Sequence, residues 1–170
     1  MDLNEEQRGI LEGSRGPYLA KCMRWLVEWG EVMGAERLIG VDNTHALLPV
    51  PNQMARGASA ETIEKYMEDL REACAHKTAP GCYCTLHVAF VTFDEVDLPE
   101  NDPDALRMQK ELADMGAEAG FIPTFTCAPY LVGNVPLIGE ICAWTESSAV
   151  VYANTILGAR TTRHGTESAI

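Results

Sequence analysis

The run "CAPYLVGNVPLIGEICAWTESSAVVYANTILGARTTR", residues 127–163, combines an apolar background with polar side chains at regular places. Residues 146–157 have the pattern of a helix, and Gly158 is suited to end it in the left-handed conformation. The twelve residues 129–140 include two prolines and two glycines, which predicts a fixed loop. Cys127 stands directly before this loop, at the end of an expected strand. Because ligands in α/β sheets bind where strands end, the run predicts a pocket around Cys127.

The polar residues of this run have a spacing that favours a binding site for a small anion. Ser147 and Asn154 fall on one face of the predicted helix. Glu146, Ser147 and Ser148 occupy its first turn, where free backbone amides favour a negative charge. Arg160 follows and is able to bind a carboxylate through two parallel hydrogen bonds. The alternative is that the serine caps the helix and Asn154 bonds a neighbouring loop, and spacing alone leaves both open.

Hydrophobic spacing predicts the elements that precede this run. A capping-box pattern at Asn4 and Gln7 begins the first expected helix. Helices are expected at about 4–11, 16–34, 59–75 and 102–120, strands at 37–42, 83–96 and 121–127, and a loop at 43–59. Helices that alternate with strands predict an α/β fold with layered helices and a mixed or parallel sheet.

Composition limits the kinds of function. The chain has 170 residues, of which 46% are hydrophobic, so it is long enough for one sizeable core and a single domain is the default. Thirteen basic against twenty-five acidic residues give a net charge of -12, which argues against nucleic acid and anionic membranes as partners. The start of the chain, "MDLNEEQRG", is acidic, and no stretch has the roughly 20 apolar residues of a spanning helix. We therefore expect a cytoplasmic protein.

Cysteines and histidines supply candidate metal ligands. In a reducing compartment the six cysteines are expected to be buried thiols, ligands or nucleophiles instead of disulfides. A zinc module built from Cys74, Cys82 and Cys84 is disfavoured, because one-residue spacing in a strand places two thiols on opposite faces. His45 and His87 are each suited to be a ligand, a general acid or a simple hydrogen-bonding residue, and the sequence leaves these alternatives open.

The run that begins at Cys127 resembles the signature of the aconitase X family, in its large subunit or catalytic domain. The segments that carry the resemblance, in the family's order, are Cys127–Leu131, Gly133–Pro136, Gly139–Trp144, Glu146–Asn154 and Leu157–Thr161. The upstream stretches "LNEEQRGILEG", "GAERLIGVDNTH" and "YCTLHV" match more weakly but in the same order. The resemblance implies that residues 1–170 are the N-terminal part of an aconitase X-type catalytic domain, with aconitase-superfamily-like layers that are incomplete relative to the family.

The activity that this resemblance implies is that of a hydro-lyase. Such a dehydratase uses an iron or iron–sulfur centre to polarise a leaving hydroxyl while a base removes the neighbouring proton. The expected substrate is a small hydroxy acid, with cis-3-hydroxy-L-proline preferred over 5-phosphomevalonate because no basic cluster suited to a phosphate stands out. The family also uses a small swivelling subunit or domain. Self-association is a further expectation, because a half-domain exposes apolar surface.

Individual roles follow from the same resemblance. Cys127 is the implied metal ligand. The implied substrate-binding residues are Asn134, Asn154 and Arg160, with Arg160 as carboxylate clamp, and the implied catalytic residues are Glu146, Ser147, Ser148 and His45.

Three departures from the family pattern favour an alternative. Ile141 and Cys142 stand where family members have histidine then isoleucine, and His87 stands where they have asparagine. Family chains also continue well past this length, and their remaining cysteines complete the metal site. The alternative expectation is therefore a truncated, non-catalytic homologue that acts as a binding or assembly module.

Overall fold

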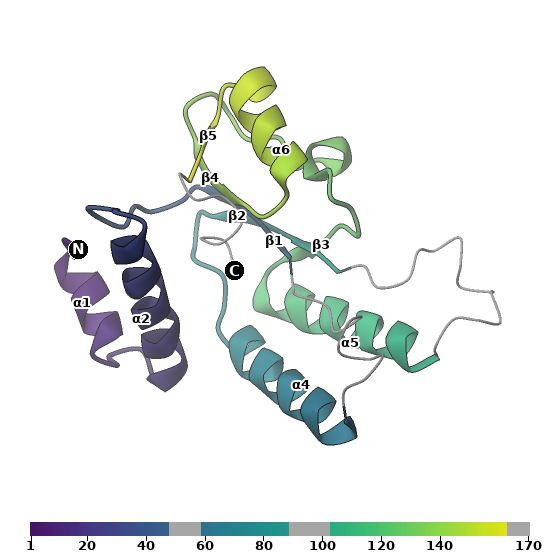
Figure 1. Cartoon of the computed structure of the whole chain (residues 1–170). Coiled ribbons are helices and arrows are strands. Elements are labelled where there is room, and N and C mark those ends of the chain that lie inside the picture. The colour runs from purple at the N-terminus through teal and green to yellow at the C-terminus, as the bar shows by residue number, and fades with distance from the viewer. Residues whose placement is uncertain (48–58, 89–102, 163–170) are drawn as a thin grey trace. The chain divides into compact units, whose positions relative to one another are not determined.

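The computed structural model describes residues 1–47, 59–88 and 103–162 of the chain (Figure 1). The chain falls into two compact units, residues 1–40 and residues 41–170, which are described separately. No helix among the described residues is long and apolar enough to cross a membrane. The expected place in the cytoplasm stays a prediction.

The first unit consists mainly of two helices, α1 (Glu5–Leu11) and α2 (Pro17–Val32). The predicted capping box begins α1: the Asn4 side chain accepts a hydrogen bond from the Gln7 amide at 2.8 Å, and the Gln7 side chain accepts one from the Asn4 amide at 2.9 Å. The backbone amides of Asn4 and Gln7, which have no partner within the helix, are thereby hydrogen-bonded. Pro17 begins α2, where its missing N–H costs nothing. Both predicted helices are confirmed.

The second unit is built on a five-stranded parallel sheet with the strand order β3-β2-β1-β4-β5. The strands are β1 (Asn43–Leu47), β2 (Tyr83–His87), β3 (Ile122–Pro123), β4 (Ile141–Trp144) and β5 (Arg160–Thr161). The helices of this unit are α4 (Ala60–Cys74), α5 (Pro103–Ala119) and α6 (Ser147–Tyr152). The α/β fold and its parallel sheet confirm the sequence prediction.

Two of the expected strand positions are wrong. The expected strand at 37–42 is not formed, and the strand begins at Asn43, in the segment expected to be a loop. Polar residues form this strand because Asn43 and His45 are buried and hydrogen-bonded on one of its faces. The strand expected at 121–127 is reduced to β3, since Phe125 has a φ of 52° and breaks the extended path. Residues 48–58 and 89–96 of the other expected segments lie outside the described residues.

The sheet has an apolar core on each face. Helices α4 and α5 cover one face, and α6 covers the other (Figure 1). The first core consists of Met67, Leu70, Leu86, Val88 and Leu112, and the second of Cys142, Trp144, Ala149, Ala153 and Ala159. Because side chains alternate along a strand, His87, which lies between Leu86 and Val88, faces α6.

The predicted helix at 146–157 is present, with Glu146 as its N-cap residue. Its first part is α6, and residues 153–157 continue it as a turn of π-helix. Gly158 ends the helix with a φ of 70°, as predicted. The short side chains Ala149 and Ala153 allow this helix to approach β4 closely, so the first turn of α6 is fixed directly after the end of that strand.

We predict that Leu112→Ala lowers the free energy of unfolding by about 2–5 kcal/mol, because the leucine is fully buried between α5 and the sheet and its removal leaves a cavity. Urea unfolding followed by circular dichroism measures the change. Ile138→Ala is the matched control, because Ile138 is 87% exposed and its removal is expected to change stability by less than about 0.5 kcal/mol. Equal stability of the two variants would contradict the assigned core.

Candidate metal centre

The order of the strands decides where a site forms on this sheet. From β1 the chain adds β2 and β3 on one side and later β4 and β5 on the other. The connections therefore diverge at β1, and ligands of open parallel sheets bind at such a point, beyond the carboxyl ends of the strands. His87 ends β2, Cys127 follows β3 and Glu146 follows β4. These three side chains come from different segments and meet at this edge.

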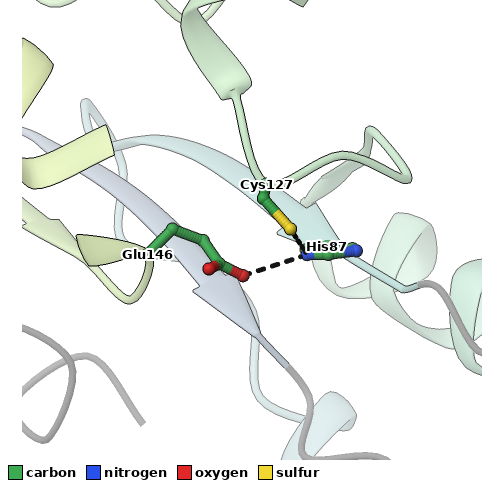
Figure 2. A group of neighbouring side chains, drawn as sticks. All are labelled: His87, Cys127 and Glu146. Carbon is green, nitrogen blue, oxygen red and sulfur yellow. Dashed lines mark hydrogen bonds and ion pairs between the residues drawn. The ribbon is translucent and has the colours of Figure 1, made fainter. Parts of the chain in front are cut away.

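The three side chains form a tight cluster (Figure 2). Nδ1 of His87 lies 3.2 Å from Oε1 of Glu146 and 3.5 Å from Sγ of Cys127. Their ligand atoms all lie within 4.8 Å of one another. His87 is buried, Glu146 is half-buried and Cys127 is exposed, so the cluster opens to solvent on one side. Imidazole, thiolate and carboxylate together are ligands suited to zinc or iron.

His45 lies behind the cluster. It is fully buried, and its ring is stacked on that of His87 with centroids 6.3 Å apart. Nδ1 of His45 is 2.9 Å from the Thr85 hydroxyl, and Nε2 has no hydrogen-bond partner among the described residues. Burial, and then the charge of His87, lower the pKa of His45 to about 4. Weaker effects of Glu146 and the nearby Thr126 backbone oppose this shift, and His45 is neutral at neutral pH.

The Cys127 thiol is not activated. Partial burial, and then the charge and hydrogen bond of Glu146, raise the pKa of Cys127 above its ordinary value. A reactive cysteine needs the opposite shift, toward the thiolate. A bound cation is the kind of group that would stabilise the thiolate here.

Asn134 joins the loop before β4 to the sheet. It is fully buried, and its side-chain oxygen accepts a hydrogen bond from Asn43 at 2.6 Å. Its amide donates to the Thr85 hydroxyl at 2.7 Å. Asn43 in turn accepts a hydrogen bond from the indole of Trp144 at 2.8 Å. Asn134 therefore has a structural place in the buried network that supports His45 and Glu146.

The other predicted site residues lie apart from this network. Ser147 and Ser148 are exposed in the first turn of α6, next to Glu146. Asn154 donates hydrogen bonds to the Val150 carbonyl at 2.9 Å and to the Thr161 hydroxyl at 2.7 Å.

Arg160 lies at the amino ends of the strands, opposite the carboxyl ends where the cluster lies. It pairs with Ile141, at the start of β4. With about 3.3 Å per residue, the start and end of this strand lie about 10 Å apart. The structure thus brings Cys127, Glu146 and His45 together, while the backbone of Arg160 lies at the start of the strand and not at its end.

Sequence reasoning left His87 open as a ligand, a general acid or a simple hydrogen-bonding residue, and did not include it among the predicted site residues. The sequence feature that could have indicated His87 is its position at the end of a strand. Side chains alternate along the strand, so it lies on the same face as Thr85. The cysteines of the disfavoured zinc module behave differently. Among the described residues neither Cys74 nor Cys82 nor Cys84 belongs to a group of three possible metal ligands.

Comparison with known proteins identifies the family of the chain. Residues 1–170 match the family described as "Aconitase X first domain". The chain belongs to the aconitase X family. The phosphomevalonate dehydratase large subunits of Methanocaldococcus jannaschii and Thermococcus kodakarensis are each 35% identical to it, over 100% of this chain and 40% of theirs. The cis-3-hydroxy-L-proline dehydratase of Pseudomonas aeruginosa is 31% identical over 95% of this chain and 26% of that enzyme.

A solved structure supports the same assignment. The crystal structure of Thermococcus kodakaraensis aconitase X in its holo-form is similar with a TM-score of 0.74 and 33% identity, and the match covers 99% of this chain and 39% of that one. The predicted family resemblance is therefore confirmed. The chain spans about 40% of the length of the phosphomevalonate dehydratase relatives, and these relatives are dehydratases.

We predict that Asn134→Ala destabilises this aconitase X chain by about 1–3 kcal/mol, because the buried side chains of Asn43 and Thr85 each lose a hydrogen bond and no water replaces it. Chemical denaturation measures the loss. Asn154→Ala is the matched control: that residue is exposed, and water replaces its hydrogen bonds, so we expect less than about 1 kcal/mol. A larger loss for Asn154→Ala than for Asn134→Ala would overturn this assignment.

Proposed function

We propose that this chain is the N-terminal part of the catalytic domain of an aconitase X-type hydro-lyase, which removes water from a small hydroxy acid. The observation that carries the proposal is the convergence of His87, Cys127 and Glu146 at the carboxyl edge of the sheet, in a chain matched by the family over its whole length. The printed names of the relatives, which are dehydratases, support the reaction class.

The cofactor that we propose is an iron or iron–sulfur centre. The side chains of the cluster fit such a group, because a thiolate, an imidazole and a carboxylate converge. Cys127 would hold the centre, with further ligands from parts of the protein outside this chain. When bound, it supplies a Lewis acid for the departing hydroxyl.

The chain's own residues would bind the substrate and move a proton. Oε1 of Glu146 is a carboxylate oxygen at the opening of the cluster and is suited to hold a proton taken from the substrate. The exposed hydroxyls of Ser147 and Ser148 follow it and are suited to donate hydrogen bonds to a bound acid. His45 supports the ring of His87 from behind.

Asn134, Asn154 and Arg160 stay proposed substrate residues on the strength of the family signature. Asn134 would act by fixing the loop that borders the cluster. Because Arg160 lies about 10 Å from the carboxyl edge, we expect its loss to weaken substrate binding more than the chemical step.

Two observations favour different substrates. The relatives with 35% identity are phosphomevalonate dehydratase large subunits, which favours 5-phosphomevalonate. The acidic composition and the lack of a basic cluster in the sequence favour cis-3-hydroxy-L-proline. We propose both as candidates, to be compared in one assay.

A second candidate function is that of a non-catalytic binding or assembly module. The observation that favours it is a set of exposed apolar side chains on the loop before β4 and on the helix of residues 147–157: Leu131, Val135, Leu137, Ile138, Val151 and Ile156. Exposed apolar side chains are typical of interfaces where they gather into a patch. We propose that this set contacts the parts of the enzyme outside this chain, including a small subunit, since relatives are called large subunits, or a second copy of the chain.

The test is complementation. We would co-produce the chain with the remaining part of the Thermococcus kodakarensis large subunit and its small subunit, under anaerobic conditions with iron and sulfide. We expect dehydration of 5-phosphomevalonate or cis-3-hydroxy-L-proline, measured as the rate at which the dehydrated product forms. Cys127→Ser should lower the rate by at least about 100-fold, because a ligand is lost.

Cys22→Ser is the matched control, because this half-buried thiol belongs to α2 in the first unit and is expected to leave the rate unchanged. Activity of the wild-type assembly no higher than that of Cys127→Ser, with both substrates, would refute the dehydratase and favour the assembly module.

A further inference from the structure

We propose that a second copy of this chain docks on an uncharged apolar patch, so that the free chain forms a symmetric dimer. The patch consists of residues 128–139, in the loop before β4, and residues 147–159, which include α6 and the π-helical turn. The inference deepens the second candidate function, the assembly module, on which it rests. It names one partner for the exposed apolar side chains and the chemical reason for that choice.

The two segments of the patch lie side by side, so that their side chains gather on one surface (Figure 1). The rings of Tyr130 and Tyr152 are stacked, with centroids 3.8 Å apart and planes 9° from parallel. At the other end of the loop, the Gly139 amide donates a hydrogen bond to the Gly158 carbonyl at 3.0 Å. A methyl group built on Gly158 would lie 3.5 Å from Cγ1 of Ile138. The loop is therefore held against the helix at both of its ends.

The apolar side chains beside these contacts are exposed to solvent. Leu131, Leu137 and Ile138 on the loop and Val151 and Ile156 on the helix are between 61% and 87% exposed. Each of the five stands within two residues of a contact between loop and helix. Contiguous apolar surface of this kind marks an interaction site on a folded chain.

The patch has no charged side chain, although the rest of the protein is rich in them. Neither residues 128–139 nor residues 147–159 include Asp, Glu, Lys, Arg or His. All 25 acidic and 13 basic residues lie elsewhere, and they give the chain a net charge of -12. Two copies with this net charge repel each other over most of their surface. At the patch they meet without placing like charges against one another.

The same chemistry selects a second copy over a charged partner. A basic partner would form its ion pairs on the acidic remainder of the chain and would gain none at the patch. A partner that fits the patch needs an apolar, uncharged surface of its own, and a second copy has one. In a two-fold dimer the same patch of both protomers meets, so the loop of one protomer is able to pack on the patch of the other.

The loop is fixed before any partner binds, which favours association. Asn134, in the middle of the loop, is fully buried, and its side chain is hydrogen-bonded to Asn43 and Thr85. Its backbone amide donates to the Pro129 carbonyl at 3.0 Å, and Pro136 is buried as well. Because the surface is already ordered, little conformational entropy is lost when it is covered.

Sedimentation equilibrium of the full, reduced chain tests the proposal. We expect the mass to rise with concentration from that of one chain to that of two. Leu137→Asp and Val151→Asp should each raise the dissociation constant by more than about 100-fold, because a dimer would bury two added carboxylates in apolar contact. Val32→Asp is the matched control: Val32 is also exposed but belongs to α2 in the first unit, so we expect the dissociation constant of the wild type.

The salt dependence distinguishes an apolar interface from one held by ion pairs. Added sodium chloride should strengthen the wild-type dimer, because salt screens the repulsion between the acidic chains and the patch has no ion pair to weaken. A dimer that dissociates as salt is added would overturn the proposal, since charged surfaces would then hold it together.

Circular dichroism checks that each variant is folded. A dimer unaffected by both Leu137→Asp and Val151→Asp would overturn the patch. A monomeric wild type that binds the added parts of the Thermococcus kodakarensis enzyme would overturn the second copy but keep the assembly module, and one that binds neither would refute both. None of these results bears on the dehydratase, which is judged by the activity of the complemented assembly.

Discussion

The hydrogen bond between the side-chain amides of Asn43 and Asn134, 2.6 Å long and fully buried, is the contact on which the candidate site depends. It joins the central strand β1 to the loop that leads into β4. Because Trp144 and Thr85 bind the same two amides, three adjacent strands are fixed in register by one polar network. In a low-dielectric core such a network is strong only when its members are satisfied, so the hydrogen bonds of Asn134 hold the loop against the sheet.

That register places the chemistry of the site. Side chains alternate along strands, so Asn43 and His45 share a face of β1, and Thr85 and His87 share the same face of β2. Asn43 and Thr85 belong to the buried hydrogen-bond network, whereas His45 and His87 lie at and behind the cluster. Trp144 ends β4 on this face, and Glu146 follows it at the carboxyl edge. The buried hydrogen-bond network and the partly exposed cluster therefore follow one another along the same face of the sheet.

The sequence was sufficient for the helices but not for the central strand. The helices were predicted because their spacing, capping residues and terminal glycines act locally. The strand β1 was missed because "NTHAL" is polar, and a polar strand is stable here only through partners about 40 and 90 residues away, at Thr85 and Asn134. No local pattern contains those partners.

The cluster was missed for a related reason. Cys127 and Glu146 were selected by the family signature, yet each was assigned a separate role. Their meeting with His87 depends on the strand order, in which β2 and β4 flank β1. Proximity of residues so far apart in sequence is a property of topology, and sequence spacing did not contain it.

The predicted site residues fall at opposite ends of the sheet, and this separation is informative. Arg160 pairs with Ile141, at the start of β4. His87 ends β2, beside Cys127 and Glu146. Because open parallel sheets bind their ligands beyond the carboxyl ends of the strands, the cluster of nitrogen, sulfur and oxygen ligands lies at the end where binding is expected, and the backbone of Arg160 lies at the other.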